Sequence, residues 1–485
     1  MHVIVIGGGI AGLATAHGLL SPGPGGLGGA PVAGVRVTLL EGSDRFGGKL
    51  RTGHVAGVGV DVGAEAMLAR RPEGVGLARA VGLGDAVRSP ALSSAAIWTG
   101  GALRPMPQDH LMGVPGTAAA LAGVLSDTGL ARVARDAELP PLELAEDVAI
   151  GRLVAERMGQ EVVDRLVEPL LGGVYAGDAY RISLRASVPA LFEAAREHDS
   201  LLAAVRSVLR HRPDDRRAPG EPVFAGLDGG LGTLPGAVAE ACRASGGDLV
   251  TGVAATGLRR TGRGWAVALD DGHSLAADGV VLAVPASAAA RLLAAEAPAA
   301  AGELGSVEYA SMAIVTMAFR REDLARLPRG SGFLVPAVDG RTIKGATFVS
   351  GKWDWAAGAD PGLFLLRVSI GRHGETAALE RDDAALVLAA LEDLGDATGL
   401  SAKPVDSLVT RWSEGLPQYP VGHCDRVDRI RRYLAGHPGL RLAGAAYDGV
   451  GIPACVASGQ RAARELLAAL PPGPRDEPTG DRPAG

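Results

Sequence analysis

The fold is decided by the N-terminal stretch Val3-Ile4-Val5-Ile6-Gly7-Gly8-Gly9-Ile10-Ala11-Gly12, which continues into an apolar segment over residues 13–20. An apolar run, a glycine-rich turn and a helix-compatible stretch predict a strand, a tight turn and a helix. Gly7 turns the chain, Gly9 lets the backbone approach a phosphate, and Gly12 lets the helix pack closely on the strand. Because the N–H groups at a helix start attract negative charge, the stretch predicts a dinucleotide site.

A second predicted strand, residues 35–40, ends at Glu41. A carboxylate at this position accepts hydrogen bonds from an adenosine ribose and argues against a 2′-phosphate, and therefore against NADP. The spacing from Gly12 to Glu41 exceeds the usual one because of a Gly/Pro-rich insert over residues 21–34, which we interpret as a surface loop. The alternative interpretation is a glycine-rich turn without a ligand.

Further along, the motif Arg45-Phe46-Gly47-Gly48-Lys49 forms a basic loop with a second glycine pair. We expect Arg45, Gly47, Gly48 and Lys49 to wrap a diphosphate from the opposite side. The small-residue turn Gly63-Ala64-Glu65, which follows a short predicted strand, suits contact with a flat ring system.

Composition limits the possible classes of protein. The chain has 485 residues, 47% of them hydrophobic, which is typical of a multidomain globular enzyme. A net charge of -6 without a sustained basic block disfavours nucleic acid. The cysteines, Cys242, Cys424 and Cys455, lie far apart, so we expect neither disulfides nor a metal site, and a cytoplasmic location fits best. No membrane span is expected, although peripheral membrane contact is left open.

The predicted fold class is α/β: a Rossmann-like nucleotide-binding domain, a substrate domain with a mixed sheet, and an inserted helical lobe. The nucleotide-binding domain is expected in three segments, 1–66, 222–284 and 405–470. The helical lobe is expected over 67–217, the substrate domain over 285–404, and a disordered tail over 471–485.

Together these segments resemble the flavin-dependent oxidoreductase superfamily that includes monoamine oxidases, phytoene desaturases and protoporphyrinogen oxidases. Within it, the bacterial coproporphyrinogen III oxidase group is the most similar. The likeness covers nearly all of residues 1–470. Its narrower motifs are DVGAE at 61–65, EPLLGGVYAG at 168–177, LPQYPVGH at 416–423 and AAYDGVGIP at 445–453.

The resemblance implies FAD as the cofactor. It places the ADP half against Gly7, Gly9, Ile10, Ala11, Gly12, Glu41, Arg45, Gly47, Gly48 and Lys49, with Gly63, Ala64 and Glu65 also at the cofactor. It places the adenine beside the backbone of Val253, and the isoalloxazine edge beside Gly451 and Ile452. Ala445 stands where many members of the superfamily carry an acid, and the porphyrinogen oxidases share this departure.

The resemblance further implies oxidation of a porphyrinogen by FAD, with molecular oxygen as acceptor and hydrogen peroxide as product. Because aromatisation drives the reaction, we expect no indispensable acid or base. A broad apolar pocket with a few cations for the substrate's propionates is expected. The candidate cations are Arg70, Arg71, Lys344, Lys352 and Arg372, of which Arg71, Lys344 and Arg372 are preferred. Tyr419 is expected to line the pocket or to brace its loop, and His423 to be structural.

Several alternatives stay open. A protoporphyrinogen IX oxidase differs from a coproporphyrinogen III oxidase in how many propionates its substrate carries. A flavin amine oxidase of the same fold would typically cage its substrate with aromatic side chains, yet only 4% of the residues are aromatic. A non-catalytic scaffold of the Rab GDP-dissociation-inhibitor type would have lost its flavin motifs, and heme handling without catalysis leaves those motifs unexplained. A ferrochelatase partner is also left open.

Overall fold

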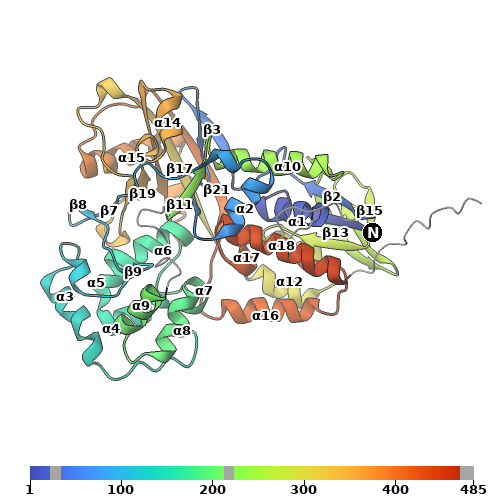
Figure 1. The fold of residues 1–485 in the computed structure, drawn as a ribbon, viewed down its shortest axis with the longest axis horizontal. Coiled ribbons are helices and arrows are strands. Elements are labelled where there is room, and N and C mark those ends of the chain that lie inside the picture. Colours follow the sequence, from blue (N-terminus) through green and yellow to red (C-terminus); the bar gives the residue numbers. More distant parts are fainter. Residues whose placement is uncertain (22–33, 212–222, 470–485) are drawn as a thin grey trace, which may run out of the picture.

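A parallel sheet built from distant parts of the chain forms the nucleotide-binding domain. The computed structural model describes residues 1–21, 34–211 and 223–469. The sheet has five strands in the order β12-β2-β1-β16-β22, and neighbouring strands are parallel. They are β1 (His2–Ile6), β2 (Arg36–Glu41), β12 (Asp248–Thr251), β16 (Gly279–Leu282) and β22 (Leu440–Leu442). The sheet lies in the domain that carries the label β2 in Figure 1.

Alternating side chains of β1 separate the two buried faces of this sheet. Val3 and Val5 face a core that includes residues of three helices, α1 (Ile10–Leu20), α10 (Leu234–Ala244) and α18 (Ile452–Ala469). Ile4 and Ile6 face the opposite core. That side is covered by a three-stranded antiparallel sheet and three helices, namely β13 (Ala255–Thr261), β14 (Gly264–Leu269), β15 (Ser274–Ala277), α11 (Ala286–Leu293), α12 (Pro298–Gly305) and α16 (His423–Leu434). The apolar run read from the sequence is therefore a strand buried on both faces.

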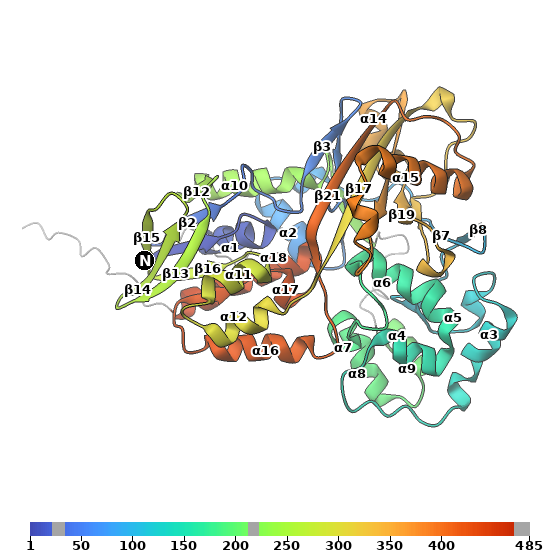
Figure 2. The ribbon, with the colours of Figure 1, turned by 180° about the vertical axis from the view of Figure 1, so that it is seen from behind.

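A mixed sheet of seven strands forms the second domain, in the order β21-β17-β20-β19-β18-β7-β8. Its strands are β7 (Ala95–Thr99), β8 (Ala102–Pro105), β17 (Tyr309–Arg320), β18 (Gly332–Leu334), β19 (Ile343–Thr347), β20 (Leu363–Ile370) and β21 (Asp406–Pro417). Only the β18–β7 pair is parallel among these strands. Helix α15 (Asp383–Thr398) covers one face, and the long strands β17 and β21 run between the two domains (Figure 2).

Below the mixed sheet lies a helical lobe with its own apolar core (Figures 1 and 2). Its helices are α3 (Asp127–Ala134), α4 (Ile150–Met158), α5 (Gln160–Val162), α6 (Glu168–Tyr175), α7 (Leu184–Ser187), α8 (Pro189–Glu197) and α9 (Leu201–Arg210). One π-helical turn, Val163–Val167, directly precedes α6, and turns of this kind are often found at functional sites. Helix α6 packs against β18 and β19 and so joins the lobe to the sheet.

Smaller elements lie between these layers. A hairpin of β3 (Thr52–Val55) and β4 (Val58–Asp61) follows the first domain segment. Strand β11 (Phe224–Leu227) pairs with β5 (Met67–Leu68) and β6 (Val87–Arg88). Four further helices are α2 (Pro72–Ala80), α13 (Val349–Lys352), α14 (Asp354–Ala359) and α17 (Ala445–Asp448).

The α/β fold class predicted from the sequence is confirmed, but the sheets draw on segments that were assigned elsewhere. Segment 67–217, expected to be a helical lobe, also supplies β7 and β8 to the mixed sheet. Segment 405–470 supplies that sheet's edge strand β21. Strand pairing joins residues far apart in sequence, so periodicity alone does not show which sheet a short strand enters. The domain limits stay predictions.

Helix α15 begins at Asp383 because the side chain of Asp382 caps it by accepting a hydrogen bond from Ala385 N at 2.7 Å. The insert over 21–34 and the tail predicted over 471–485 fall mostly outside the described residues. None of the described helices is both long and apolar enough to cross a membrane.

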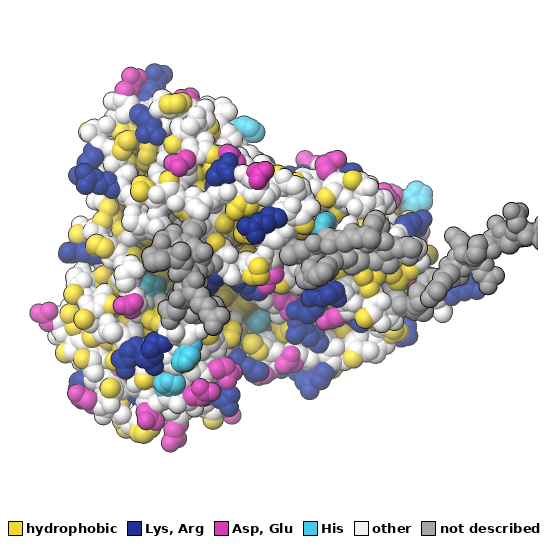
Figure 3. Space-filling model, viewed as in Figure 1, with side chains coloured by type: hydrophobic (Ala, Val, Ile, Leu, Met, Phe, Trp, Pro, Cys, Tyr) yellow, Lys and Arg dark blue, Asp and Glu magenta, His cyan; other side chains and the backbone are white. Residues whose placement is uncertain are grey.

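Surface charge is mixed. On the face drawn in Figure 3, basic and acidic side chains of the described residues are interspersed over both domains and the lobe. That distribution agrees with the small net charge of -6 and offers nucleic acid no continuous basic surface on the described part of this face.

Candidate cofactor and substrate site

The glycine turn between β1 and α1 has the geometry that a bound phosphate requires. Gly7 has a φ of +107°, and a Cβ atom there would lie 2.5 Å from Ala283 O. A Cβ at Gly12 would lie 1.8 Å from Gly7 O, so helix α1 can approach the turn only without a side chain. A Cβ at Gly9 would meet no protein atom within 4 Å, and this residue is partly exposed to solvent. The space in front of Gly9 is therefore open, at the N-terminus where Ile10 and Ala11 begin the helix.

Glu41 lies beside this turn, at the end of β2. One carboxylate oxygen accepts a hydrogen bond from Gly8 N at 2.7 Å and the other from Ser43 N at 2.8 Å. Both oxygens retain acceptor capacity, because a carboxylate offers about four acceptor positions. The amide of Val253 donates to Glu41 O at 3.1 Å, so the structure brings the predicted adenine and ribose positions together.

The basic loop after β2 folds back onto the glycine turn. Gly47 N donates to Gly8 O at 2.8 Å, and a Cβ at Gly48 would lie 3.3 Å from the Cα atom of Gly9. The guanidinium of Arg45 donates to carbonyl oxygens of its own loop, including Gly48 O at 2.8 Å. Arg45 therefore holds the loop in shape. The loop lies against the glycine turn, and its contact with a diphosphate stays a prediction.

The turn at residues 63–65 packs against this loop. Ala64 N donates to Lys49 O at 3.2 Å, and a Cβ at Gly63 would lie 2.0 Å from that same oxygen. Glu65 is buried and forms ion pairs with Lys352 Nζ at 2.5 Å and Arg367 Nε at 3.3 Å. Burial acts to raise the pKa of Glu65, but these two cations outweigh it and hold the pKa below its ordinary value.

This pairing changes the role of Lys352, which the sequence offered as a candidate for binding propionate. Its ammonium is already neutralised by Glu65, so Lys352 fixes the turn that carries Gly63 and Ala64.

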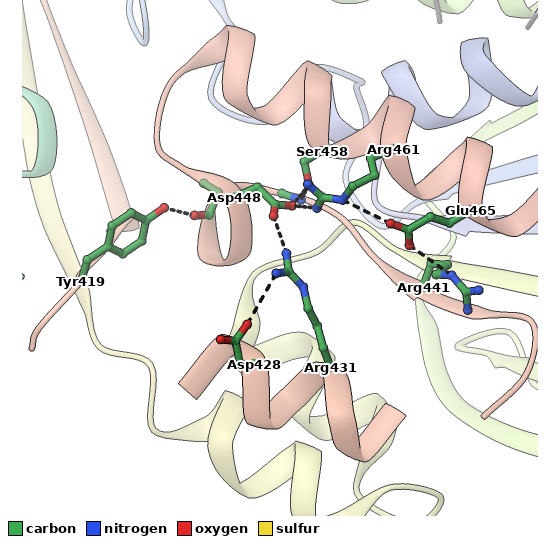
Figure 4. Close-up of polar contacts among 10 residues, drawn as sticks. Tyr419, Asp428, Arg431, Arg441, Asp448, Ser458, Arg461 and Glu465 are labelled. Carbon is green, nitrogen blue, oxygen red and sulfur yellow. Dashed lines mark hydrogen bonds and ion pairs between the residues drawn. The ribbon is translucent and has the colours of Figure 1, made fainter. Parts of the chain in front are cut away.

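At the other end of the chain, a network centred on Asp448 positions the turn before α18 (Figure 4). Arg431 Nη2 lies 2.5 Å from Asp448 Oδ1, while Ser458 and Arg461 donate to Oδ2. The Ser458 hydroxyl also accepts from Gly444 N at 2.9 Å. Helices α16, α17 and α18 are thus tied together at the residue that precedes the turn 449–451. We call Asp448, Arg431, Ser458 and Arg461 the Asp448 network.

The turn that follows is open to solvent. Gly451 has a φ of +108°, is exposed, and a Cβ there would meet no atom within 4 Å. Ile452 begins helix α18 and is buried. A second helix N-terminus with accessible backbone therefore stands at Gly451 and Ile452, whose contact with the cofactor stays a prediction.

The thiol of Cys455, in the first turn of α18, marks where the N-terminal and C-terminal parts of the site converge. Burial raises the pKa of Cys455 to about 11; the nearby charges of Lys49 and Arg71 lower it, and Asp448 raises it. Lys49 itself retains exposed surface, yet desolvation lowers the pKa of its ammonium. Three segments far apart in sequence thus place two cations near the start of α18.

These features fit FAD. The open space at Gly9 and the exposed backbone at Gly48 can receive phosphates, and the exposed backbone at Gly451 can receive a ring edge. The carboxylate of Glu41 has acceptor positions left for a ribose. The residues that would hold the ADP half surround the start of α1, and those that would meet the flavin surround the start of α18.

The candidate substrate residues differ in their surroundings. Arg70 is exposed, and Arg71 is half-exposed and pairs with Glu73 at 3.1 Å. Tyr419 is buried, donates its hydroxyl to Ala445 O and stacks on His423 at a ring distance of 4.1 Å. Of the two roles that the sequence left open for Tyr419, the contacts match the brace.

Lys344 and Arg372 are both buried, on β19 and just after β20. Desolvation and the charge of Arg372 lower the pKa of Lys344 to about 8, while Glu168 and Glu375 raise it. These two cations lie where the mixed sheet meets the helical lobe.

Several residues that shape the site were not predicted. Asp61 accepts hydrogen bonds from Leu231 N and Gly232 N, both at 2.8 Å, and burial raises its pKa to about 6. A Cβ at Gly459 would lie 2.2 Å from Ala11 O, so this glycine lets α18 pack on α1. The signal for Gly459 was a glycine inside a helical pattern, which often marks a close approach of another backbone. Asp61 begins the DVGAE motif, but nothing in that motif indicated that its carboxylate would accept these two backbone hydrogen bonds.

Comparison with known proteins agrees with this geometry. The sequence pattern of the flavin-containing amine oxidoreductase family matches residues 10–467. The coproporphyrinogen III oxidase of Mycobacterium leprae is 38% identical over 468 residues, covering 96% of this chain and 98% of the relative. The protoporphyrinogen oxidase of Bos taurus is 31% identical over 495 residues, covering 97% and 99%. A crystal structure from Exiguobacterium sp. 255-15 has a TM-score of 0.82 and 30% identity, and covers 97% of this chain and 99% of that one.

The chain belongs to the flavin-containing amine oxidoreductase family. It is an FAD-dependent oxidase, similar over its length to porphyrinogen oxidases. The predicted family, cofactor and enzyme class are confirmed.

Proposed function

We propose that this enzyme oxidises coproporphyrinogen III to coproporphyrin III in heme biosynthesis, with molecular oxygen as the electron acceptor. The observation that carries the proposal is that the domain with the residues that would hold FAD adjoins a mixed sheet that carries buried cations. Full-length likeness to the M. leprae coproporphyrinogen III oxidase supports the choice of substrate.

The reaction removes six electrons and six protons from the macrocycle. FAD, when bound, supplies a two-electron acceptor, so three oxidations complete one substrate molecule. With three molecules of oxygen reduced to three of hydrogen peroxide, atoms and electrons balance. The protein's own task is to hold the cofactor, position the ring and exclude water, because formation of the aromatic product drives the reaction.

The chain's residues divide that task. The glycine turn, Glu41 and the basic loop would hold the ADP half, and the Asp448 network would fix the turn that meets the flavin. Lys344, Arg372 and Arg71 would meet carboxylates of the substrate, and Tyr419 would brace the nearby loop. We assign no side chain as an acid or base.

Protoporphyrinogen IX is the second candidate substrate, favoured by the likeness to the Bos taurus protoporphyrinogen oxidase. Peripheral membrane contact and a ferrochelatase partner stay predictions. Three free cysteines are compatible with a reducing compartment such as the cytoplasm.

An aerobic assay of the purified flavoprotein tests the proposal. Coproporphyrinogen III and protoporphyrinogen IX are supplied side by side, porphyrin fluorescence is followed, and peroxide is quantified against porphyrin. We expect faster oxidation of coproporphyrinogen III and three peroxides per porphyrin, with no multiple turnover without oxygen. Equal rates on both substrates would contradict the substrate choice, and sustained anaerobic turnover would contradict oxygen as acceptor.

A further inference from the structure

Two buried cations lie together on the face of the mixed sheet that meets the helical lobe. Lys344, on β19, is 5% exposed, and Arg372, just after β20, is 9% exposed. The neighbouring residue Ile343 packs in the core that includes helix α15, and the pairing of β19 with β20 is irregular between Ile343 and Gly345, at Lys344. Lys344 and Arg372 are called the cation pair below.

Lys344 has no close ion pair. No hydrogen bond and no ion pair within 4.0 Å involves its ammonium in the described part of the chain, although the carboxylates of Glu168 and Glu375 attract it from farther away. Holding a buried ammonium without a close counter-charge is costly, so buried lysines are normally paired. Lys344 is therefore a candidate for binding an anionic group.

Arg372 is partly satisfied. Its Nη2 donates to Val335 O at 3.0 Å, and its Nε lies 3.4 Å from Glu168 Oε1 without forming a hydrogen bond of good geometry. Glu375, 3.7 Å away, is more than half exposed and so compensates little. Two buried positive charges thus share one buried carboxylate, Glu168.

Glu168 is held in place by the lobe. It is the first residue of α6, directly after the π-helical turn, and its Oε2 accepts from Ala337 N at 3.0 Å. A Cβ at Gly172 would lie 3.3 Å from Glu168 Oε1, so the glycine leaves room for this carboxylate. Its role toward the cation pair is to fix Arg372.

Helix α6 links the cation pair to the flavin side of the site. At its far end, about 10 Å from Glu168 by helix rise, Tyr175 contacts Tyr419, whose hydroxyl reaches Ala445 before the Asp448 network. His373 N also donates to Ala176 O at 2.6 Å. A substrate macrocycle that lies along α6, with its reacting edge toward α18, would direct one of its own peripheral side chains toward the cation pair.

We propose that Lys344 and Arg372 bind a propionate of the substrate that is present in coproporphyrinogen III and replaced by a vinyl group in protoporphyrinogen IX, and so determine substrate specificity. Glu168 is a positioning residue for Arg372. This inference rests on the proposed function. A vinyl group at this place would leave Lys344 buried and unpaired, which disfavours protoporphyrinogen.

The test compares both substrates in matched variants. Lys344→Met and Arg372→Met remove one charge each, Lys344→Arg keeps it, and Lys403→Met removes a lysine charge at an exposed position. For each protein, kcat and KM are measured with coproporphyrinogen III and protoporphyrinogen IX, together with FAD content and thermal midpoint. Binding of coproporphyrin III and protoporphyrin IX is followed by fluorescence quenching.

We expect Lys344→Met to lower kcat/KM for coproporphyrinogen III by about 10- to 100-fold, mainly through KM, and to change the value for protoporphyrinogen IX less than threefold. Lys344→Arg should retain the preference, and Lys403→Met should match wild type. Glu168→Gln should shift the preference in the same direction as Arg372→Met, by a smaller factor.

An unchanged preference in Lys344→Met, with FAD content intact, would overturn the inference. An equal loss on both substrates would also do so, because it indicates a structural role. If wild type oxidises neither porphyrinogen, the proposed function itself fails. If Lys344→Met and Arg372→Met both keep the substrate preference of wild type, only the role of the cation pair is refuted. Should the methionine variants fold poorly, the Lys344→Arg and Glu168→Gln comparison still decides: equal preference in all three proteins contradicts the proposal.

Discussion

Replacing Gly9 by alanine should separate cofactor binding from folding. Gly9 has φ -68° and ψ 174°, an ordinary extended conformation, and a Cβ there meets no protein atom within 4 Å. The folded apoprotein should therefore accept Gly9→Ala with a change in stability of about 1 kcal/mol or less. The added methyl group instead enters the space that we assign to the pyrophosphate.

The expected loss of affinity follows from the geometry of that methyl group. It extends about 1.5 Å from the Cα atom, enough to lengthen a hydrogen bond of about 2.9 Å beyond its useful range. Losing one charge-assisted hydrogen bond costs about 1.5–3 kcal/mol, and the phosphate's attraction to the helix dipole weakens as well. We expect a total near 3 kcal/mol, or more than about 100-fold weaker FAD binding.

Titration of apoprotein with FAD, followed by flavin fluorescence, measures this loss, and thermal unfolding of the apoprotein measures stability. Gly12→Ala is the matched control, because its Cβ would lie 1.8 Å from Gly7 O and should destabilise the apoprotein itself. Wild-type affinity for FAD in Gly9→Ala would refute the assignment of this space to the pyrophosphate, and so would a destabilisation of the apoprotein as large as that in Gly12→Ala.

Two further predictions concern the C-terminal part of the site. Burial and, after it, the charge of Arg426 lower the pKa of His423 to about 4, so the folded state favours the neutral histidine. The folding stability that depends on this neutral form is therefore present above the unfolded pKa of 6.5 and is lost as the pH falls toward 4. When the pH is lowered from 7 to 5, the free energy of unfolding measured with denaturant should fall by about 2 kcal/mol more in wild type than in His423→Phe. Equal decreases in the two proteins would contradict this. Asp448→Asn should weaken FAD binding about tenfold and cost about 1–2 kcal/mol of stability, whereas Asp428→Asn, at an exposed partner of Arg431, should change neither; a normal FAD affinity in Asp448→Asn would refute the positioning role.

The local part of the site could be predicted because its signals are contiguous. The turn 7–12 combines an apolar strand, three glycines and a helix within one short segment, and backbone sterics leave such a segment few other structures. Glu41 was predicted from its place at the end of the second strand, despite the unusually long spacing, and the loop 45–49 from its glycine pair and its basic residues. The family resemblance supplied Gly451 and Ile452, which contiguous signals alone would not have linked to the N-terminus.

The sequence by itself determined the cofactor class, because strand, turn and helix N-terminus are specified by neighbouring residues. Tertiary structure decided which charged groups are paired and which are free. Lys344 and Lys352 look alike in the sequence, yet Lys352 pairs with Glu65 at 2.5 Å, whereas no described carboxylate lies within ion-pair distance of Lys344. Burial and pairing depend on segments that meet only after folding, so no local pattern could distinguish these two lysines.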